Sequence, residues 1–128
     1  MRPPFTDKDA ADLNFRWRRL MLENKPWRQP TLSLDLVARM LGTSSRHVSL
    51  MLSRDNKSFK SELRRFRVQE AKRLLEEDPS LDNAAVAARS GLGSPGNLAC
   101  LFREAYGITT REFRQSVLLE KDASFRHR

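Results

Sequence analysis

The sequence predicts an all-α protein in which two short helix pairs are joined by a long central helix and preceded by an extra N-terminal amphipathic helix. Apolar residues recur every three to four positions along most of the 128 residues, as in helices that bury one face. One pattern also occurs twice, 49 residues apart, at Val37, Ala38 and Gly42 and again at Val86, Ala87 and Gly91. Such an internal repeat predicts two copies of one structural unit.

The first predicted helix runs from about Asp7 to Glu23. Thr6 and Asp9 have the spacing of a capping box at its start. Its apolar face consists of Leu13, Trp17, Leu20 and Met21. The opposite face is basic and leaves two interpretations open: the helix packs on the domain and exposes this side to solvent, or it is a dimerisation or phosphate-contacting arm. Two prolines in residues 25–30 predict a loop after the helix, with Trp27 as a packing anchor.

The first helix pair occupies residues 34–54, and Ser33 can cap its first helix. The predicted apolar face of that helix consists of Leu36, Val37, Met40 and Leu41. Gly42 suits the left-handed end of a helix, and Thr43 or Ser44 can cap the second helix. The inward residues of the second helix are Val48, Met51 and Leu52. A helix with an apolar back and a hydrogen-bonding front, placed after a glycine-containing turn, is typical of a helix-turn-helix unit.

A long basic helix, residues 58–77, is predicted next. Asn56 fits a left-handed turn before it, and Asp78 followed by Pro79 ends it. Its apolar stripe consists of Phe59, Leu63, Phe66, Ala71, Leu74 and Leu75. Residues 56–75 carry seven basic and two acidic side chains, a net charge of +5. Charge runs usually form solvated helix faces. This one lies between two helix-turn-helix units, which favours the interpretation that part of it lies near DNA phosphates.

The second helix pair repeats the start signals of the first. Asp82 can cap a helix over residues 83–90, and Ser94 followed by Pro95 marks the start of a helix over residues 95–105. The inward residues of the latter are Leu98, Leu101 and Phe102. Gly107 ends it. A capping box of Thr109 and Glu112 then starts a closing helix.

These elements predict the following division of the chain. Residues 1–31 form the N-terminal helix and a proline-containing linker, residues 32–119 a double helix-turn-helix domain, and residues 120–128 a charged, frayed tail. Within the domain, module one is residues 33–54, the linking helix 58–77, module two 82–105 and the closing helix 110–119.

Composition narrows the class of protein. The net charge of +8 and the pI of about 10.5 suggest a polyanionic partner. The single cysteine, Cys100, cannot form an internal disulfide, and we expect it to be buried or to line a groove. No apolar run is long enough to span a membrane, so we predict a cytoplasmic protein. Without an acid–base pair, a phosphate loop or a metal cluster, the sequence predicts no enzyme, no catalytic residue, no cofactor and no metal site.

Residues Leu32 to Ser116 resemble the DNA-binding domain of the AraC/XylS family of transcription regulators. The resemblance is carried by Ala38, Gly42, Phe59, Arg67, Ala71, Leu74, Leu75, Ala87, Gly91, Ser94, Phe102, Gly107, Thr109, Phe113 and Arg114. It implies a bacterial-type transcription factor with two helix-turn-helix modules on a rigid helix. Each module then inserts its second helix into a major groove, about one DNA turn apart. Asn83 departs from the pattern at a position that is usually apolar, which predicts a looser second module, and Thr110 replaces a common proline.

The outward positions of the two recognition helices supply the site candidates. The base-reading candidates are Ser45, Arg46, Ser49, Leu50 and Asn97. The candidates for phosphate contacts or positioning are Ser44, His47, Ser53, Arg54, Lys57, Arg64, Ser94 and Arg103. Arg46 leads the first group, because a guanidinium can pair with O6 and N7 of guanine. The outward positions of module two are Pro95, Gly96, Ala99 and Cys100, which donate almost no hydrogen bonds. We therefore expect module one to dominate base readout.

The function predicted from these features is sequence-specific binding of double-stranded DNA and regulation of transcription. The expected partner is double-stranded DNA, and no membrane is expected. The resemblance further implies contact with RNA polymerase if the protein activates transcription, and a separate sensory or dimerisation domain of a longer regulator. The alternative is a protein-interaction module that keeps the fold but lacks specific DNA reading. The poor outward face of module two and the amphipathic N-terminal helix favour that alternative.

Overall fold

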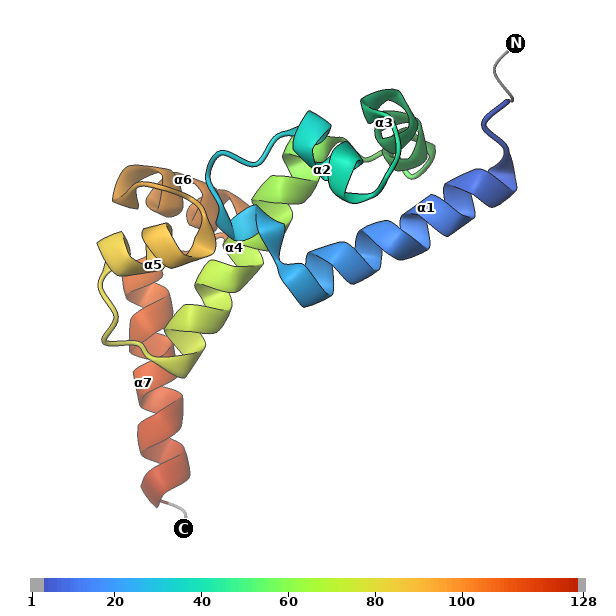
Figure 1. The fold of residues 1–128 in the computed structure, drawn as a ribbon. Helices are drawn as coiled ribbons and strands as arrows, with labels where there is room; N and C mark the ends of the chain where they lie inside the picture. The colour runs from blue at the N-terminus through green and yellow to red at the C-terminus, as the bar shows by residue number, and fades with distance from the viewer. Residues whose placement is uncertain (1–3, 127–128) are drawn as a thin grey trace. The chain divides into compact units, whose positions relative to one another are not determined.

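Helices make up the regular secondary structure of the described part of the chain. The structure, a computed structural model, describes residues 4–126, with side chains up to residue 123, and no strand occurs among them. The all-α fold class predicted from the sequence is therefore confirmed. The helices form two compact units, one ending at Leu63 and one beginning at Arg64 (Figure 1).

The first unit begins with helix α1, Asp7–Arg19. The predicted capping box is present: Asp9 N donates to Thr6 Oγ1 at 3.1 Å, and Thr6 N donates to Asp9 Oδ2 at 3.0 Å. Hydrogen bonding of the Asp9 carboxyl to Thr6, first of all from the Thr6 backbone N–H, holds the pKa of this carboxyl below its usual value. The predicted helix continues beyond α1 only as a π-helical turn, Leu20–Asn24, and then a 3₁₀ turn, Pro26–Arg28. Trp27 is the predicted anchor, buried and donating from Nε1 to Met21 O at 2.9 Å.

The helix pair of this unit consists of α2, Leu34–Met40, and α3, Ser45–Arg54. Ser33 and Ser44 cap the two helices, each accepting a backbone N–H at 3.2 Å. Between them Gly42 has a φ of 68°, the left-handed conformation expected there. Helix α1 packs against α3 (Figure 1). The buried side chains of α1, its π-helical extension, α2 and α3 include Leu13, Trp17, Met21, Val37, Val48, Met51 and Leu52.

The predicted apolar face of α2 is half wrong. Val37 and Leu41 are buried, but Leu36 is 36% and Met40 is 49% exposed. The two pairs lie on adjacent stripes of the helix, each four residues apart. A helix of seven residues packed at one side buries only one of these stripes, with the small Ala38 beside it.

Helix α4 spans Phe59–Glu77, close to the predicted range of 58–77. Ser58 starts it, since its Oγ accepts from Ser61 N at 3.1 Å. The turn before it contains Asn56 with a φ of 55°, as predicted. The predicted stripe is correct for the buried Leu63, Ala71 and Leu75. It missed Val68, which is also buried.

The second unit adds α5, Asn83–Ser90, α6, Pro95–Tyr106, and α7, Thr110–Arg126, to the C-terminal part of α4. Its core consists of Val68, Ala71, Leu75, Val86, Ala87, Leu92, Leu98 and Phe102. Each predicted start signal is used: Asp82 and Ser94 cap their helices, and Thr109 and Glu112 form the capping box of α7. The structure thus gives both predicted helix pairs their expected starts.

The closing helix is longer than predicted. It was expected to end near residue 119 in a frayed tail, but α7 continues to Arg126; residues 127 and 128 of that tail lie outside the described part. Residues 118–123 contain no glycine or proline, so nothing in them ends a helix. Lys121 Nζ also donates to Glu77 O at 3.2 Å, which joins α7 to the end of α4.

Arg114 of α7 holds the loop between α4 and α5. Its guanidinium donates to the carbonyl of Pro79 at 3.1 Å, to that of Leu81, and to Asn83 Oδ1. The polar Asn83, which departs from the family pattern, therefore forms a hydrogen bond where an apolar contact is usual. This interaction opposes the loosening that the sequence suggested.

Candidate nucleic-acid interface

Helix α3 has the two-sided character of a recognition helix. Val48, Met51 and Leu52 are buried against the unit, which fixes the rotation of the helix about its axis. The opposite side exposes Arg46, Ser49, Leu50 and Ser53. The glycine turn and the Ser44 cap define where α3 starts. Because the apolar side is buried, the exposed side lies at the surface of the unit.

The outward side chains of α3 differ in how free they are. Within the described residues, Arg46 and Ser49 form no side-chain hydrogen bond or ion pair, so both can approach a ligand. Ser45 instead donates its hydroxyl to Asp35 of α2. Ser53 donates to Leu50 O at 2.9 Å. Among the polar base-reading candidates on α3, Arg46 and Ser49 are therefore the two available groups.

The N-terminal segment, here residues 5–16, covers the flank of α3 that faces α1. The ring of Phe5 stacks on His47, with centroids 4.5 Å apart and planes 17° apart. Arg54 lies 5.8 Å from the same ring and forms an ion pair with Asp7. His47 Nδ1 also lies 3.1 Å from Thr43 Oγ1. The sequence did not reveal the contacts of Phe5 and Asp7 with α3, because no local spacing connects these residues with a helix some forty residues away.

Helix α6 has the same construction and a different outer face. Leu98 and Phe102 are fully buried, whereas the predicted outward residues Pro95, Gly96, Ala99 and Cys100 are exposed. Asn97, the one base-reading candidate here, donates from Nδ2 to Leu92 O at 2.9 Å. Its amide therefore braces the turn before α6 and is engaged within the protein.

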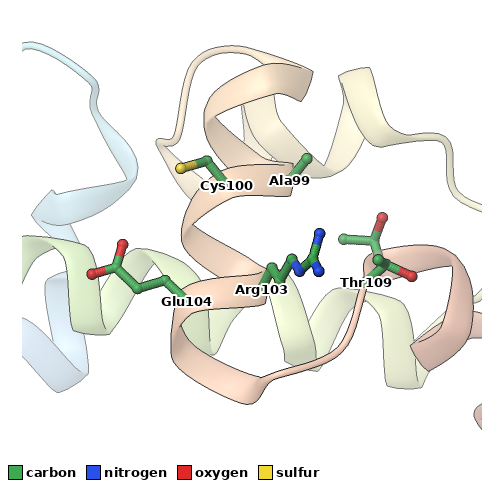
Figure 2. A pocket seen from close by; sticks show the side chains of 6 residues that line it. Ala99, Cys100, Arg103, Glu104 and Thr109 are labelled. Atoms are coloured by element: carbon green, nitrogen blue, oxygen red, sulfur yellow. The ribbon is translucent and has the colours of Figure 1, made fainter.

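A shallow hollow lies between the outer face of α6 and the start of α7. Its lining consists of Ala99, Cys100, Arg103, Glu104, Thr109 and Thr110. Figure 2 shows Arg103 extending toward Thr109, while Glu104 points to the opposite side. Cys100 is exposed here, so the expectation of a buried thiol is wrong and that of a groove-lining thiol holds. Arg103 has no ion pair among the described residues, which leaves it the cation best placed for an anionic ligand at this face.

The basic charge of α4 is unevenly available. In its C-terminal half Arg73 pairs with Glu70 and Glu77, and Lys72 pairs with Glu76 at 3.8 Å. Burial lowers the pKa of Arg67. Around the start of the helix, Lys57, Lys60 and Arg64 are exposed and form no ion pair within the described part of the chain. The phosphate-contacting candidates Lys57 and Arg64 thus lie near the start of α4 and form no ion pair among the described residues.

Residues 4–126 contain neither a cluster of possible metal ligands nor a helix that could span a membrane. No group of three or more histidine, cysteine, aspartate or glutamate side chains among them could hold a metal ion. Over the same residues, no helix is both long enough and apolar enough to cross a membrane.

Comparisons with known proteins agree with this geometry. A family model described as a helix-turn-helix domain matches residues 37–116. The C-terminal domain of AraT, a response regulator from Geobacillus stearothermophilus, is 26% identical with a TM-score of 0.71, covering 81% of this chain and 84% of that one. A DNA-binding transcriptional dual regulator from Escherichia coli K-12 is 23% identical with a TM-score of 0.72, covering 81% and 92%.

A third structure is the C-terminal domain of the two-component response regulator yesN from Fusobacterium nucleatum. It is 22% identical with a TM-score of 0.65, covering 79% of this chain and 98% of that one. No curated protein is significantly similar to this chain. The family match spans well over half of the sequence and includes the second helix pair in full and most of the first, so the predicted resemblance is confirmed. This chain belongs to the family of AraC-type helix-turn-helix domains and is a DNA-binding domain of the kind that regulates transcription.

Proposed function

We propose that this protein binds a specific sequence in double-stranded DNA and thereby regulates transcription. Residues 44–54 and 95–105 act as recognition helices in successive major grooves. The observation that carries the proposal is the outer face of α3, where Arg46 is exposed and has no partner in the described residues. A guanidinium presented in this way can bind O6 and N7 of a guanine at once.

The phosphate contacts that we propose surround these helices. Ser44 and Ser94 sit at the N-termini of α3 and α6, where free backbone N–H groups favour an anion. Unpaired positive charge comes from Lys57, Arg64 and Arg103. Ser53, exposed on α3, is a further candidate for a phosphate contact. Contacts of this kind set the position of a protein on the duplex without selecting its sequence.

Module one dominates base readout in this proposal. Its outer face offers a free guanidinium at Arg46, a free hydroxyl at Ser49 and an apolar contact for a thymine methyl at Leu50. The Ser45 hydroxyl can contact a base only if it gives up its hydrogen bond to Asp35. The outer face of α6 offers little, since Asn97 is engaged with Leu92 O. We therefore assign α6 mainly to positioning, with Asn97 as a brace.

The alternative function is a protein-interaction module without specific DNA reading, and the exposed side chains of the N-terminal helix add an observation in its favour. Phe15 and Leu22 lie seven residues apart on the N-terminal helix and its π-helical extension, and are 63% and 68% exposed. Exposed apolar side chains on one helix face suit a protein contact. The same face also suits the partners expected of a regulator, RNA polymerase or a separate sensory or dimerisation domain.

The proposal is tested with Arg46→Ala and the matched control Arg18→Ala, an exposed arginine on α1 with no partner in the described part of the chain. Affinity is measured on an enriched DNA sequence and on its scrambled version at about 150 mM salt. Loss of one bidentate base contact should cost Arg46→Ala about 1–3 kcal/mol on the enriched sequence and much less on the scrambled one. Arg18→Ala should affect both equally and slightly. An equal loss on both sequences for Arg46→Ala would make it a phosphate contact and contradict the proposal.

A further inference from the structure

We infer that the N-terminal segment is part of the DNA interface and that Asp7 weakens DNA binding by occupying Arg54, a cation suited to a backbone phosphate. The inference rests on the proposed function, because it places α3 in a major groove. The ligand concerned is the phosphodiester backbone of duplex DNA. The Asp7 carboxylate and a backbone phosphate carry charge of the same sign and compete for one guanidinium.

The first step concerns which way the side chains of α3 face. Successive residues of an α-helix are about 100° apart, so Arg46 and Leu50 point away from the buried Val48. His47 and Arg54, seven residues apart, lie together on the flank between the outer and the buried sides. A helix in a major groove directs its outer side to base edges. Its flanks face the phosphate strands that border the groove, so Arg54 is placed for a phosphate.

The second step concerns what covers this flank. Phe5 contacts both of its residues, stacking on His47 at 4.5 Å and lying 5.8 Å from the Arg54 guanidinium carbon. Asp7, in the first turn of α1, forms the ion pair with Arg54. Further along α1, Arg16 Nη1 donates to Leu41 O at 2.6 Å. The segment is thus attached to α3 and to the end of α2, and Asp7 is held at the position that a phosphate strand would approach.

The third step is electrostatic. The Asp7 side chain is 98% exposed and that of Arg54 is 41% exposed, so the pair contributes little to folding stability. It nevertheless neutralises Arg54. A phosphate that approaches Arg54 has to displace the carboxylate and then remains close to it, and both effects oppose binding. Removing the charge of Asp7 while keeping its shape should therefore release one additional phosphate contact.

The experiment compares Asp7→Asn with Asp12→Asn in the full chain. Asp12 is a matched control because it lies on the same helix, is exposed, has no partner in the described residues and changes the net charge equally. Affinity for a mixed-sequence duplex of about 20 base pairs, enough for two major-groove sites, is measured by fluorescence anisotropy at several salt concentrations. Circular dichroism checks that both variants keep the helix content of the parent.

Asp7→Asn should tighten binding about two- to five-fold, the range of a surface ion pair, and steepen the log–log salt dependence by about 0.9, one phosphate contact. Asp12→Asn should change affinity less and leave the slope unchanged. In an Arg54→Gln background the effect of Asp7→Asn should vanish. Equal gains for both variants would assign the effect to overall charge, and weaker binding of Asp7→Asn would make Asp7 a support for Arg54; either result overturns the inference.

Failure of the proposed function looks different in this experiment. It appears as equal affinity of the parent protein for an enriched and a scrambled duplex, whatever residue stands at position 7. Failure of the inference appears as equal affinity of the parent and Asp7→Asn for the mixed-sequence duplex. The two results are read from different pairs of measurements.

Discussion

Helices α3 and α6 share the same kind of cap and a similar pattern of buried residues, but they differ in the residues that face outward. Each is capped by a serine that accepts the N–H three residues later at 3.2 Å, Ser44 and Ser94. Each buries an aliphatic residue completely at the matching position, Val48 and Leu98. On the outer face, Arg46 of α3 corresponds to Gly96 of α6 under the 50-residue displacement that follows the turns. Within the proposed function, presenting a helix and equipping it to read bases are therefore separate properties of this fold.

The largest expected effect concerns the packing behind α6. Phe102 is fully buried, with its ring 4.8 Å from that of Tyr106 and 5.5 Å from that of Phe113. Phe102→Ala should lower the free energy of unfolding by about 3–5 kcal/mol because it leaves a cavity. Urea denaturation checks this, with the half-buried Leu101→Ala as the milder control. A cost below about 1 kcal/mol for Phe102→Ala would mean that α6 is loosely held and that the two helices differ in packing as well as in surface.

The next prediction concerns Gly96→Arg, which gives α6 an arginine at the position that corresponds to Arg46 of α3. A Cβ added at Gly96 would meet no atom within 4 Å, and the backbone there is helical, so Gly96→Arg should fold. The new guanidinium should add about 1–3 kcal/mol of discrimination at one base pair in the half-site of module two. Gly96→Ala is the matched control, since it shares the gain in helix propensity without the donor. Selection of bound sequences checks the result; an unchanged motif for Gly96→Arg would show that α6 does not face base edges.

A smaller effect tests the equal presentation of the two helices. Ser44→Ala and Ser94→Ala each remove one side-chain cap of the same geometry. Each should lower the free energy of unfolding by about 1 kcal/mol. Thermal and urea unfolding of the two variants side by side measure the difference. A cost at one helix several times that at the other would break the structural equivalence on which the comparison depends.

The smallest expected effect is at the outer face of α6 itself. Cys100 is exposed and lines the hollow between α6 and α7. Cys100→Ser keeps the size of the side chain, and the selected DNA motif should stay unchanged because α6 mainly positions the protein. Sequence selection on this variant and on the parent gives the measurement. A changed base preference in the half-site of module two would show that Cys100 touches base edges.

Much of the fold could be predicted because the signals for it are local. Ser33, Ser44, Asp82 and Ser94 each act within three residues of themselves, and every one of these predicted caps is present. The repeat at 49 residues placed the two helix pairs. Local signals failed where burial depends on a partner, as with Met40, which has the correct spacing for the core and is exposed.

The site was predictable only as a set of outward positions. Helical spacing placed Arg46 and Ser49 on the exposed side of α3, and the structure has them there. It could not show that Ser45 is engaged by Asp35 or that Asn97 is engaged by Leu92 O. Nor could it show that Phe5 covers His47, since each of these contacts depends on tertiary structure rather than on spacing along one helix.

The most direct test of the asymmetry between α3 and α6 is selection of bound sequences from a random DNA pool by the parent protein. The pool is bound at about 150 mM salt, where non-specific binding by a basic surface is weak. We expect a motif with one sharply specified half and one weakly specified half about one DNA turn away. Two equally sharp halves would agree with a sequence-specific regulator but contradict the proposal that α3 dominates base readout and α6 mainly positions the protein. A pool without any enriched motif would contradict sequence-specific binding altogether.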